Sequence, residues 1–210
     1  MAPATNLRAV IFDFGGVLLD MRWDVARELD RAHGLPKSSV FETLYRCPAW
    51  DDIECGAGDP AEWIENAHRE LERRAGRALP RLHEKWRRAQ TVIDANLAVV
   101  RSLRPPYRCS ILSNADLSLR ERLKGDLAMD HLFDDIVVSA EVGMAKPRPE
   151  IFRLAADRLG LPPAACVFVD DWDQNVDAAR AVGMPAVLHR VDQGNDLRAQ
   201  LAALGVAPGA

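Results

Sequence analysis

The sequence is poor in cysteine, and the few cysteines form no recognisable framework. The 210 residues contain four cysteines, namely Cys47, Cys55, Cys109 and Cys166. Their spacings give no Cys-x-x-Cys pair and no zinc pattern with histidine, so we expect reduced thiols rather than disulfides. The first ten residues also lack the long apolar core of a signal peptide. Together these absences predict a cytoplasmic protein.

Long apolar runs and an excess of one charge are also missing. No apolar run approaches the roughly 18 to 20 residues that cross a bilayer, so a membrane partner is not expected. The 27 basic and 31 acidic residues give a net charge of −4, which does not favour nucleic acid as a partner. The composition, 48% hydrophobic, is that of a soluble globular chain with a sizeable core. We expect a monomer or a homodimer, and the sequence does not distinguish them.

What the sequence does contain is a series of short apolar runs with the length and composition of buried strands. These runs are Arg8–Phe12, Arg108–Leu112, Ile136–Val138, Cys166–Val169 and Ala186–Leu188. Helical patterns fill most of the links between them. In one, Pro149 suits the first turn and Gly160 the end, and Gly183 suits the end of the next helix. Alternating strands and helices predict an α/β fold with a parallel sheet covered on both faces.

The link between the first two predicted strands is far longer than the dozen or more residues that a parallel crossover needs. It carries helical patterns at residues 23–33, 39–45, 60–72 and 82–103. We therefore expect a helical cap inserted at residues 18–90, with the α/β core formed by residues 1–17 and 91–210. The pattern at 82–103 predicts one long helix that returns to the sheet.

Polar side chains follow several of the predicted strands. They are Asp13 after the first strand, Ser113 and Asn114 after the second, Lys146 before the fourth, and Asp170 and Asp171 after it. Ligands of open parallel sheets bind beyond the carboxyl ends of the strands. We therefore expect all six residues at one edge of the sheet.

The carboxylates in this set indicate a metal site. Carboxylates at close quarters repel one another unless a cation or protons intervene. Asp13, Asp170 and Asp171 offer the hard oxygen ligands that Mg²⁺ prefers in proteins. The alternative for the last two is that they cap the helix that follows them.

The other residues suit phosphoryl transfer. Lys146 is a compact charge that can hold both a phosphoryl oxygen and a nucleophilic carboxylate. Ser113 and the backbone N–H of Asn114 can donate to further phosphoryl oxygens. Asp13 is then the candidate nucleophile, and its attack on phosphorus would give an aspartyl-phosphate intermediate.

Four segments in order resemble the four motifs of the haloacid dehalogenase-like (HAD) superfamily. They are FDFGGV with Asp13, ILSN with Ser113, GMAKPRPEIF with Lys146, and VFVDDWDQN with Asp170 and Asp171. The insert segment ECGAGDPAEW is also similar to the family, so the resemblance covers nearly the whole chain. It implies a Rossmann-like core closed by a helical cap. It further implies Mg²⁺ bound by Asp13, the Gly15 carbonyl and Asp171, with Asp170 in support.

The chain departs from this pattern at Gly15. Most phosphatases that it resembles have a second Asp at this position, which protonates the leaving oxygen and later activates water. A positioned general acid–base contributes about 10²–10⁴-fold, so Gly15 leaves this role unassigned. Members with an FDxGxV motif, including sugar-phosphate phosphatases, resemble this chain, so phosphatase activity remains compatible with Gly15.

The leading hypothesis is a magnesium-dependent phosphatase that acts on a small phosphorylated metabolite. A 2-haloacid dehalogenase is the first alternative, because a halide leaves without a proton and needs no acid at Gly15. Against it, dehalogenation uses no metal, and the Asp170–Asp171 pair would repel a carboxylate substrate. The second alternative is a catalytically weak protein that binds a phosphate or a partner.

Two residues beside this site have open roles. Asn175 either orients Asp171 or is an ordinary residue of the first helical turn. Trp172 either lines the substrate pocket or packs on the cap.

Overall fold

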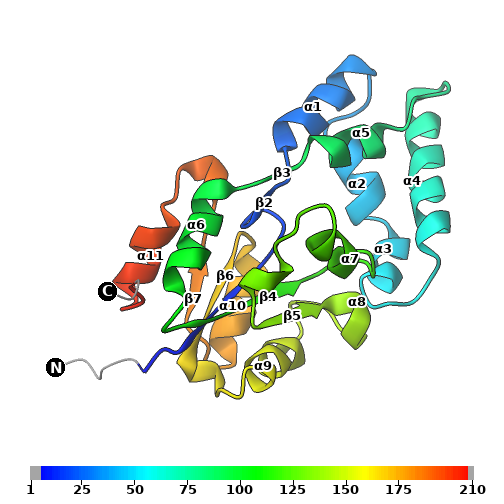
Figure 1. The fold of residues 1–210 in the computed structure, drawn as a ribbon. Helices are drawn as coiled ribbons and strands as arrows, with labels where there is room; N and C mark the ends of the chain where they lie inside the picture. The colour runs from blue at the N-terminus through cyan, green and yellow to red at the C-terminus, as the bar shows by residue number, and fades with distance from the viewer. Residues whose placement is uncertain (1–5, 208–210) are drawn as a thin grey trace.

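The centre of the computed structural model, which describes residues 6–207, is a five-stranded parallel sheet (Figure 1). Its strands are β1 (Ala9–Phe12), β4 (Arg108–Ser113), β5 (Asp135–Val138), β6 (Cys166–Asp170) and β7 (Ala186–Leu188). The spatial order is β5-β4-β1-β6-β7, and every pair is parallel. All five predicted strands are present with ends shifted by one residue at most. The predicted α/β, Rossmann-like fold is therefore confirmed.

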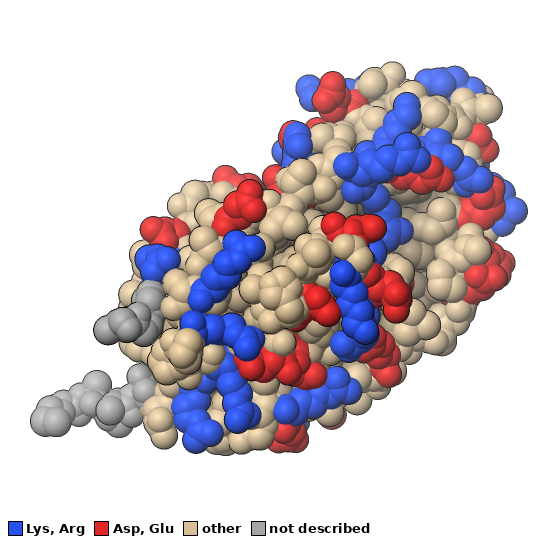
Figure 2. Space-filling model, viewed as in Figure 1, with Lys and Arg blue, Asp and Glu red and all other residues tan. Residues whose placement is uncertain are grey.

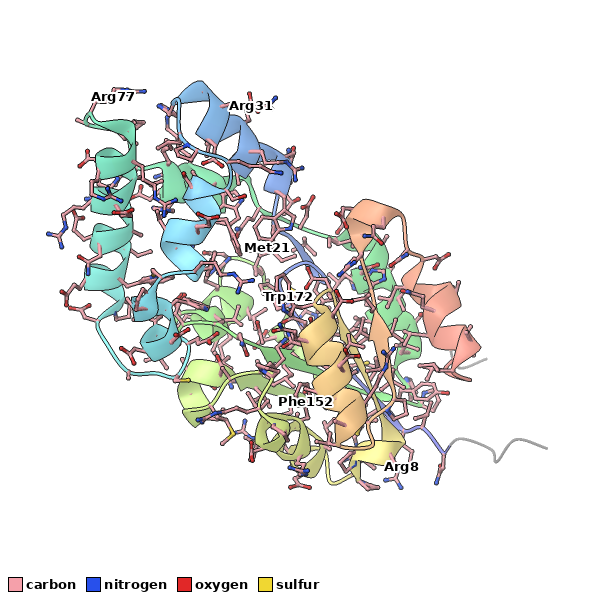
Figure 3. All side chains as sticks on the ribbon, turned by 180° about the vertical axis from the view of Figure 1, so that it is seen from behind. Arg8, Met21, Arg31, Arg77, Phe152 and Trp172 are labelled. Carbon is pink, nitrogen blue, oxygen red and sulfur yellow. The ribbon has the colours of Figure 1, made fainter. Side chains whose placement is uncertain are left out.

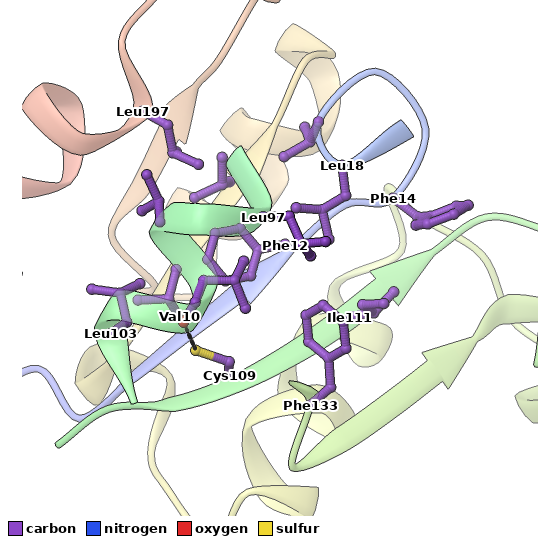
Figure 4. Packing of buried hydrophobic residues seen from close by; sticks show 14 of the residues in the cluster. Val10, Phe12, Phe14, Leu18, Leu97, Leu103, Cys109, Ile111, Phe133 and Leu197 are labelled. Atoms are coloured by element: carbon purple, nitrogen blue, oxygen red, sulfur yellow. Dashed lines mark hydrogen bonds between the residues drawn. The ribbon is translucent and has the colours of Figure 1, made fainter. Parts of the chain in front are cut away.

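Both faces of the sheet are covered by helices. On β1, Val10 and Phe12 point into one apolar cluster, which Figure 4 shows in close-up, while Ala9 and Ile11 point into another on the opposite face. The first cluster is closed by α6 (Asp94–Leu103), α7 (Leu119–Lys124) and α11 (Leu197–Ala203), and the second by α9 (Pro149–Arg158) and α10 (Asp173–Ala181). Burial of apolar surface on both sides fixes the sheet as the middle layer.

Local sequence signals set the ends of the two helices on the second face. Pro149 occupies the first turn of α9, as predicted. Gly160 and Gly183, just beyond the ends of α9 and α10, have φ values of 64° and 80°. Residues with a side chain rarely adopt this left-handed backbone conformation, so glycine is favoured at both positions.

A layer of five helices lies beyond the carboxyl ends of the strands, at the upper right of Figure 1. These helices are α1 (Trp23–Ala32), α2 (Ser39–Tyr45), α3 (Pro48–Ile53), α4 (Pro60–Ala75) and α5 (Leu82–Ala89). They share an apolar cluster that is separate from the two clusters of the sheet. We call residues 23–89 the helical layer. Trp86 is fully buried at its centre, beside Trp23 at 5.3 Å and Tyr45 at 5.9 Å between ring centroids.

Two short strands connect the helical layer to the sheet. They are β2 (Leu19–Asp20) and β3 (Thr91–Val92), which pair antiparallel. This pair lies beside the positions at which the sequence predicts the division between cap and core. The division itself stays a prediction.

The single long helix predicted over residues 82–103 is wrong. The chain forms α5 and α6 with the extended strand β3 between them. Thr91, Val92 and Ile93 are three consecutive β-branched residues, whose side chains lose rotamer freedom in a helix. The short helix α3 was not predicted at all, although Pro48 at its first position favours a helix start.

The remaining elements are short. They are α8 (Ser139–Val142) and the 3₁₀ helices Asp130–Leu132, Pro163–Ala165 and Val191–Gln193. Basic and acidic side chains are interspersed on the face that Figure 2 shows. Of the helices formed by residues 6–207, none is long and apolar enough to cross a membrane.

Trp86 provides a test of the helical layer. Its side chain is fully buried, and its indole N–H donates to the Met21 carbonyl at 2.6 Å. We expect Trp86→Ala to lower the free energy of unfolding by about 3–5 kcal/mol, because it removes a buried aromatic side chain. Trp172→Ala is the control, since Trp172 is 44% exposed and should cost no more than about 1 kcal/mol. Urea unfolding of the two variants would measure the difference, and equal losses would contradict the packing described here.

Candidate active site

All six residues that the sequence places at the strand ends come together in the structure. A cavity of about 1110 Å³ between the sheet and the helical layer is lined by Asp13, Ser113, Asn114, Lys146 and Asp171 among others. The sixth residue, Asp170, lies within 4.8 Å of Asp13 and Asp171, measured between carboxylate oxygens. The sheet brings these groups together because its parallel strands end at the same edge. Gly15, in the turn after β1, also lines the cavity.

Lys146 is the cation at the centre of the site. Its Nζ lies 2.9 Å from Asp13 Oδ1 and 2.7 Å from Asp170 Oδ2, and its side chain is 1% exposed. Burial lowers the pKa of Lys146, but the two carboxylates outweigh burial, and the pKa ends above its ordinary value. Lys146 therefore carries a positive charge and holds the ends of β1 and β6 together.

Asp170 is held by donors on every side. Besides Lys146, the backbone N–H of Trp172 donates to its Oδ1 at 2.8 Å, and the Asn175 amide donates to both oxygens at 3.2 and 3.1 Å. The hypothesis that Asn175 orients Asp171 is therefore wrong, because the amide reaches the neighbouring carboxylate instead. These contacts leave Asp170 fixed in one orientation.

Asp171 has the opposite environment. Within residues 6–207, no other residue donates a hydrogen bond to its carboxylate. Its pKa is raised to about 7, first by burial and then by the nearby charges of Asp13 and Asp170. The pKa of Asp13 is also raised, chiefly by burial, although Lys146 opposes the shift. The site thus gathers three carboxylates around one lysine, and its negative charge is only partly compensated.

This arrangement fits a divalent cation. The oxygens of Asp13, Asp170 and Asp171 lie close enough to share one ion. The Asp171 carboxylate, which accepts no hydrogen bond from another described residue, is the ligand most available to that ion. Hard carboxylate oxygens are the ligands that Mg²⁺ prefers. A cation here would also relieve the repulsion between the carboxylates.

The turn after β1 passes close against Asp171. Gly16 has a φ of 82°, and a Cβ added to it would overlap the Asp171 carboxylate. Gly15 has no positive φ, and a Cβ there would meet only the side chain of Met21, at 3.3 Å. The conformational demand for glycine therefore falls on Gly16, and a side chain at Gly15 requires only that Met21 shifts slightly.

Ser113 and Asn114 hold different positions at the end of β4. The Ser113 side chain is buried beside the cavity and makes no hydrogen bond to any residue from 6 to 207, so it is free to meet a ligand. The Asn114 amide instead bonds the main chain of Lys146: its Nδ2 donates to the carbonyl at 2.9 Å, and its Oδ1 accepts from the N–H at 2.8 Å. Asn114 therefore positions Lys146.

The helical layer contributes residues that the sequence analysis did not single out. Glu54, Trp50 and Arg46 come from the segment around α3 and line the same cavity. The Arg46 guanidinium lies 5.0 Å from the ring centroid of Trp172, so Trp172 both lines the cavity and contacts the helical layer. Figure 3 shows Trp172 and Met21 in the middle of the molecule, between the two parts. The only sign of this arrangement in the sequence is the glycine at position 56, whose close contact, Ala140, lies far away along the chain.

Comparison with known proteins identifies the family to which this chain belongs. A sequence model of the haloacid dehalogenase-like hydrolases matches residues 7–183, which include every residue of the carboxylate–lysine cluster. The chain belongs to this family. It is therefore a hydrolase, and the resemblance seen in the four sequence motifs is confirmed.

Relatives within the haloacid dehalogenase-like family include named phosphatases. The chain is 32% identical over 203 residues to Phosphatase MT3486 of Mycobacterium tuberculosis, which covers 92% of this chain and 91% of that protein. It is 27% identical over 205 residues to the Phosphorylated carbohydrates phosphatase of Thermotoga maritima, with coverage of 96% and 93%. These likenesses indicate a hydrolase of the phosphatase type.

Solved structures agree on the fold. HAD family enzyme BT-2542 of Bacteroides thetaiotaomicron, solved with magnesium and inorganic phosphate, matches with a TM-score of 0.71 at 22% identity, covering 91% of this chain and 97% of that one. The L-2-haloacid dehalogenase PA0810 matches with a TM-score of 0.63 at 23% identity, covering 88% and 85%. Both a phosphate-bound enzyme and a dehalogenase thus share this fold, so the fold alone does not separate the two reactions.

The two glycines after Asp13 provide a matched test of the turn. We expect Gly16→Ala to lower the free energy of unfolding by about 1–3 kcal/mol, because its backbone conformation is strained for any side chain. The added methyl group would also displace the Asp171 carboxylate. Gly15→Ala should change stability by less than about 1 kcal/mol, because only the flexible Met21 side chain must shift. Chemical denaturation of both variants would measure this contrast, and a larger loss at Gly15 would refute it.

Proposed function

We propose that this hydrolase is a magnesium-dependent phosphatase that acts on small phosphorylated metabolites through an aspartyl-phosphate on Asp13. The observation that carries the proposal is the cluster of Asp13, Asp170 and Asp171 around the buried Lys146. A phosphate ester brings its own negative charge, and such a ligand needs both a lysine and a cation beside these carboxylates.

The roles of the residues follow from their contacts. Asp13 is the nucleophile: one of its oxygens is held by Lys146 and by the backbone N–H of Phe14 at 2.7 Å, which leaves the other free for phosphorus. Lys146 also neutralises charge on the phosphoryl group. The free hydroxyl of Ser113 and the backbone N–H of Asn114 are placed to bind the remaining phosphoryl oxygens.

Mg²⁺ would be held by Asp13, the backbone carbonyl of Gly15 and Asp171. Asp170 would support the ion indirectly, since its oxygens already accept hydrogen bonds from Lys146, the Trp172 N–H and Asn175. When bound, the ion would neutralise phosphoryl oxygens and orient the phosphoryl group toward Asp13. The helical layer would act as the cap, because it closes the cavity on the side opposite the strand ends.

The charge of the site favours a phosphatase over a 2-haloacid dehalogenase. Dehalogenation of a carboxylate substrate uses no metal, and three carboxylates against one lysine would repel that substrate. The named phosphatases among the relatives favour the same choice. The dehalogenase remains the second candidate because Gly15 leaves the core without an acid, which a departing halide does not need.

Turnover of an aryl phosphate tests the proposed function. We expect activity that requires added Mg²⁺ and falls by about 10³-fold or more in Asp13→Asn, which removes the nucleophile. Asp171→Asn should lose activity and raise the Mg²⁺ concentration needed for half-maximal rate. Asp177→Asn is the matched control, because this α10 side chain is 76% exposed and outside the cluster. Full activity in EDTA, or in Asp13→Asn, would disprove the proposal, and release of halide from a 2-haloacid would favour the alternative.

A further inference from the structure

Cleavage of an alkyl phosphate leaves a basic alkoxide, which needs a proton as it departs. Among the described residues, the three carboxylates of the cluster supply no free acid for this step. Asp13 attacks, Asp170 is held by Lys146, and Asp171 is the expected ligand of the cation. The proton donor must therefore be sought among the other groups that line the cavity.

Among the residues that the structure describes, five other aspartates line the cavity, and each is paired, bonded to a backbone N–H or exposed. Asp24 pairs with Arg22 at 2.8 Å, and Asp116 accepts from the Ser118 N–H at 2.8 Å. Asp20 likewise accepts a hydrogen bond from a backbone N–H at 2.8 Å. Asp51 and Asp192 are exposed to solvent. The remaining carboxyl group is that of Glu54, which is half-buried at the end of α3.

A close backbone contact fixes Glu54 over the site. Gly56, two residues later, has a φ of 76°, and a Cβ there would overlap the carbonyl oxygen of Ala140 in α8. The turn after α3 is therefore seated directly on the core, and Figure 1 shows α3 next to α7 and α8. Only glycine permits this approach.

Glu54 also lies next to the groups that bind the phosphoryl oxygens. Glu54 lines the same cavity as Asn114, Trp50 and Lys146, and the charge of Lys146 lowers its pKa. The same Asn114 amide holds the main chain of Lys146. Glu54 thus faces the same cavity as Asp13, from the helical layer rather than from the sheet.

We propose that Glu54 is the acid–base residue of the reaction, a catalytic role that rests on the proposed phosphatase function. In the first step, an Asp13 oxygen bonds to phosphorus, the phosphorus–oxygen bond of the ester breaks, and the leaving oxygen takes the proton of Glu54. In the second step, the Glu54 carboxylate takes a proton from water, whose oxygen attacks the phosphorus. Phosphate leaves, the Asp13 carboxylate is restored, and Glu54 is protonated again.

The electrostatic environment of Glu54 suits both steps. Burial, and to a smaller extent the charge of Asp51, raise its pKa to about 7, although Trp50, Asn114 and Lys146 oppose the shift. Cys55 is its other titratable neighbour. An acid–base residue is most effective when its pKa lies near the working pH, because both protonation states are then populated.

The test compares kcat/KM for an aryl and an alkyl phosphate, since kcat/KM reports the first chemical step. We expect Glu54→Gln to lower kcat/KM by about 10²–10⁴-fold for the alkyl ester and by less than about tenfold for the aryl ester, whose anion leaves without a proton. In the native protein, kcat/KM for the alkyl ester should fall as the pH rises above about 7, and this fall should disappear in Glu54→Gln. In Glu54→Gln, the aryl ester should also give a burst of product, because breakdown of the aspartyl-phosphate has lost its base.

Two further variants sharpen the result. Asp52→Asn, an exposed position on the same helix, should leave the ratio between the two esters unchanged. Adding Gly15→Asp to Glu54→Gln should recover part of the alkyl activity, because a side chain at Gly15 requires only a small shift of the flexible Met21 side chain.

The outcomes separate this inference from the function on which it rests. If the native chain cleaves both esters and Glu54→Gln changes neither, or slows both equally, Glu54 is not the acid. If the native chain cleaves neither ester with Mg²⁺ present, the phosphatase proposal fails, and this inference fails with it.

Discussion

The contact on which the site depends is the buried ammonium group of Lys146 between Asp13 and Asp170. It joins the ends of two neighbouring strands to the loop that precedes α9. A single buried carboxylate would be costly without a partner, and here one lysine serves two. The Asn114 amide fixes the lysine's main chain, and Asn175 and the Trp172 N–H saturate Asp170. Because those positions are rigid, the remaining carboxylates of Asp13 and Asp171 are presented in a defined geometry, which is what preorganised electrostatic catalysis requires.

The sheet and the helical layer contribute different groups to the cavity. The sheet holds the groups that act on phosphorus, and the helical layer contributes Glu54, Trp50 and Arg46 to the same cavity. The parts meet at a few close contacts: the turn at Gly56 on Ala140, and the Arg46 guanidinium over the Trp172 ring. A proton donor carried by the helical layer would be in place only while these contacts hold. Chemistry that needs a proton would then depend on the seating of the helical layer, whereas attack by Asp13 would not.

The sequence predicted the sheet and the core residues of the site because both depend on local signals. Buried parallel strands are continuous apolar runs, and Asp13, Ser113 and Asp170 stand where those runs end. Other features depend on contacts between distant segments. The helical periodicity continues through Thr91–Ile93, so it conceals the break that β3 makes there. Nothing near Asn175 shows which of two adjacent carboxylates it bonds. Glu54 is placed by a glycine contact with Ala140, more than eighty positions away in the sequence.

The three hydrophobic clusters have a consequence for how such a chain changes over generations. Two clusters cover the faces of the sheet, while the third is built from α1–α5 and the loops between them, and among the described residues it shares Met21 with the first. A substitution in the third cluster therefore perturbs packing that the strands do not share. Mutational drift in the helical layer can reshape the wall facing the metabolite while the carboxylate–lysine cluster keeps its geometry. Selectivity can then change over evolution while the attack by Asp13 is preserved.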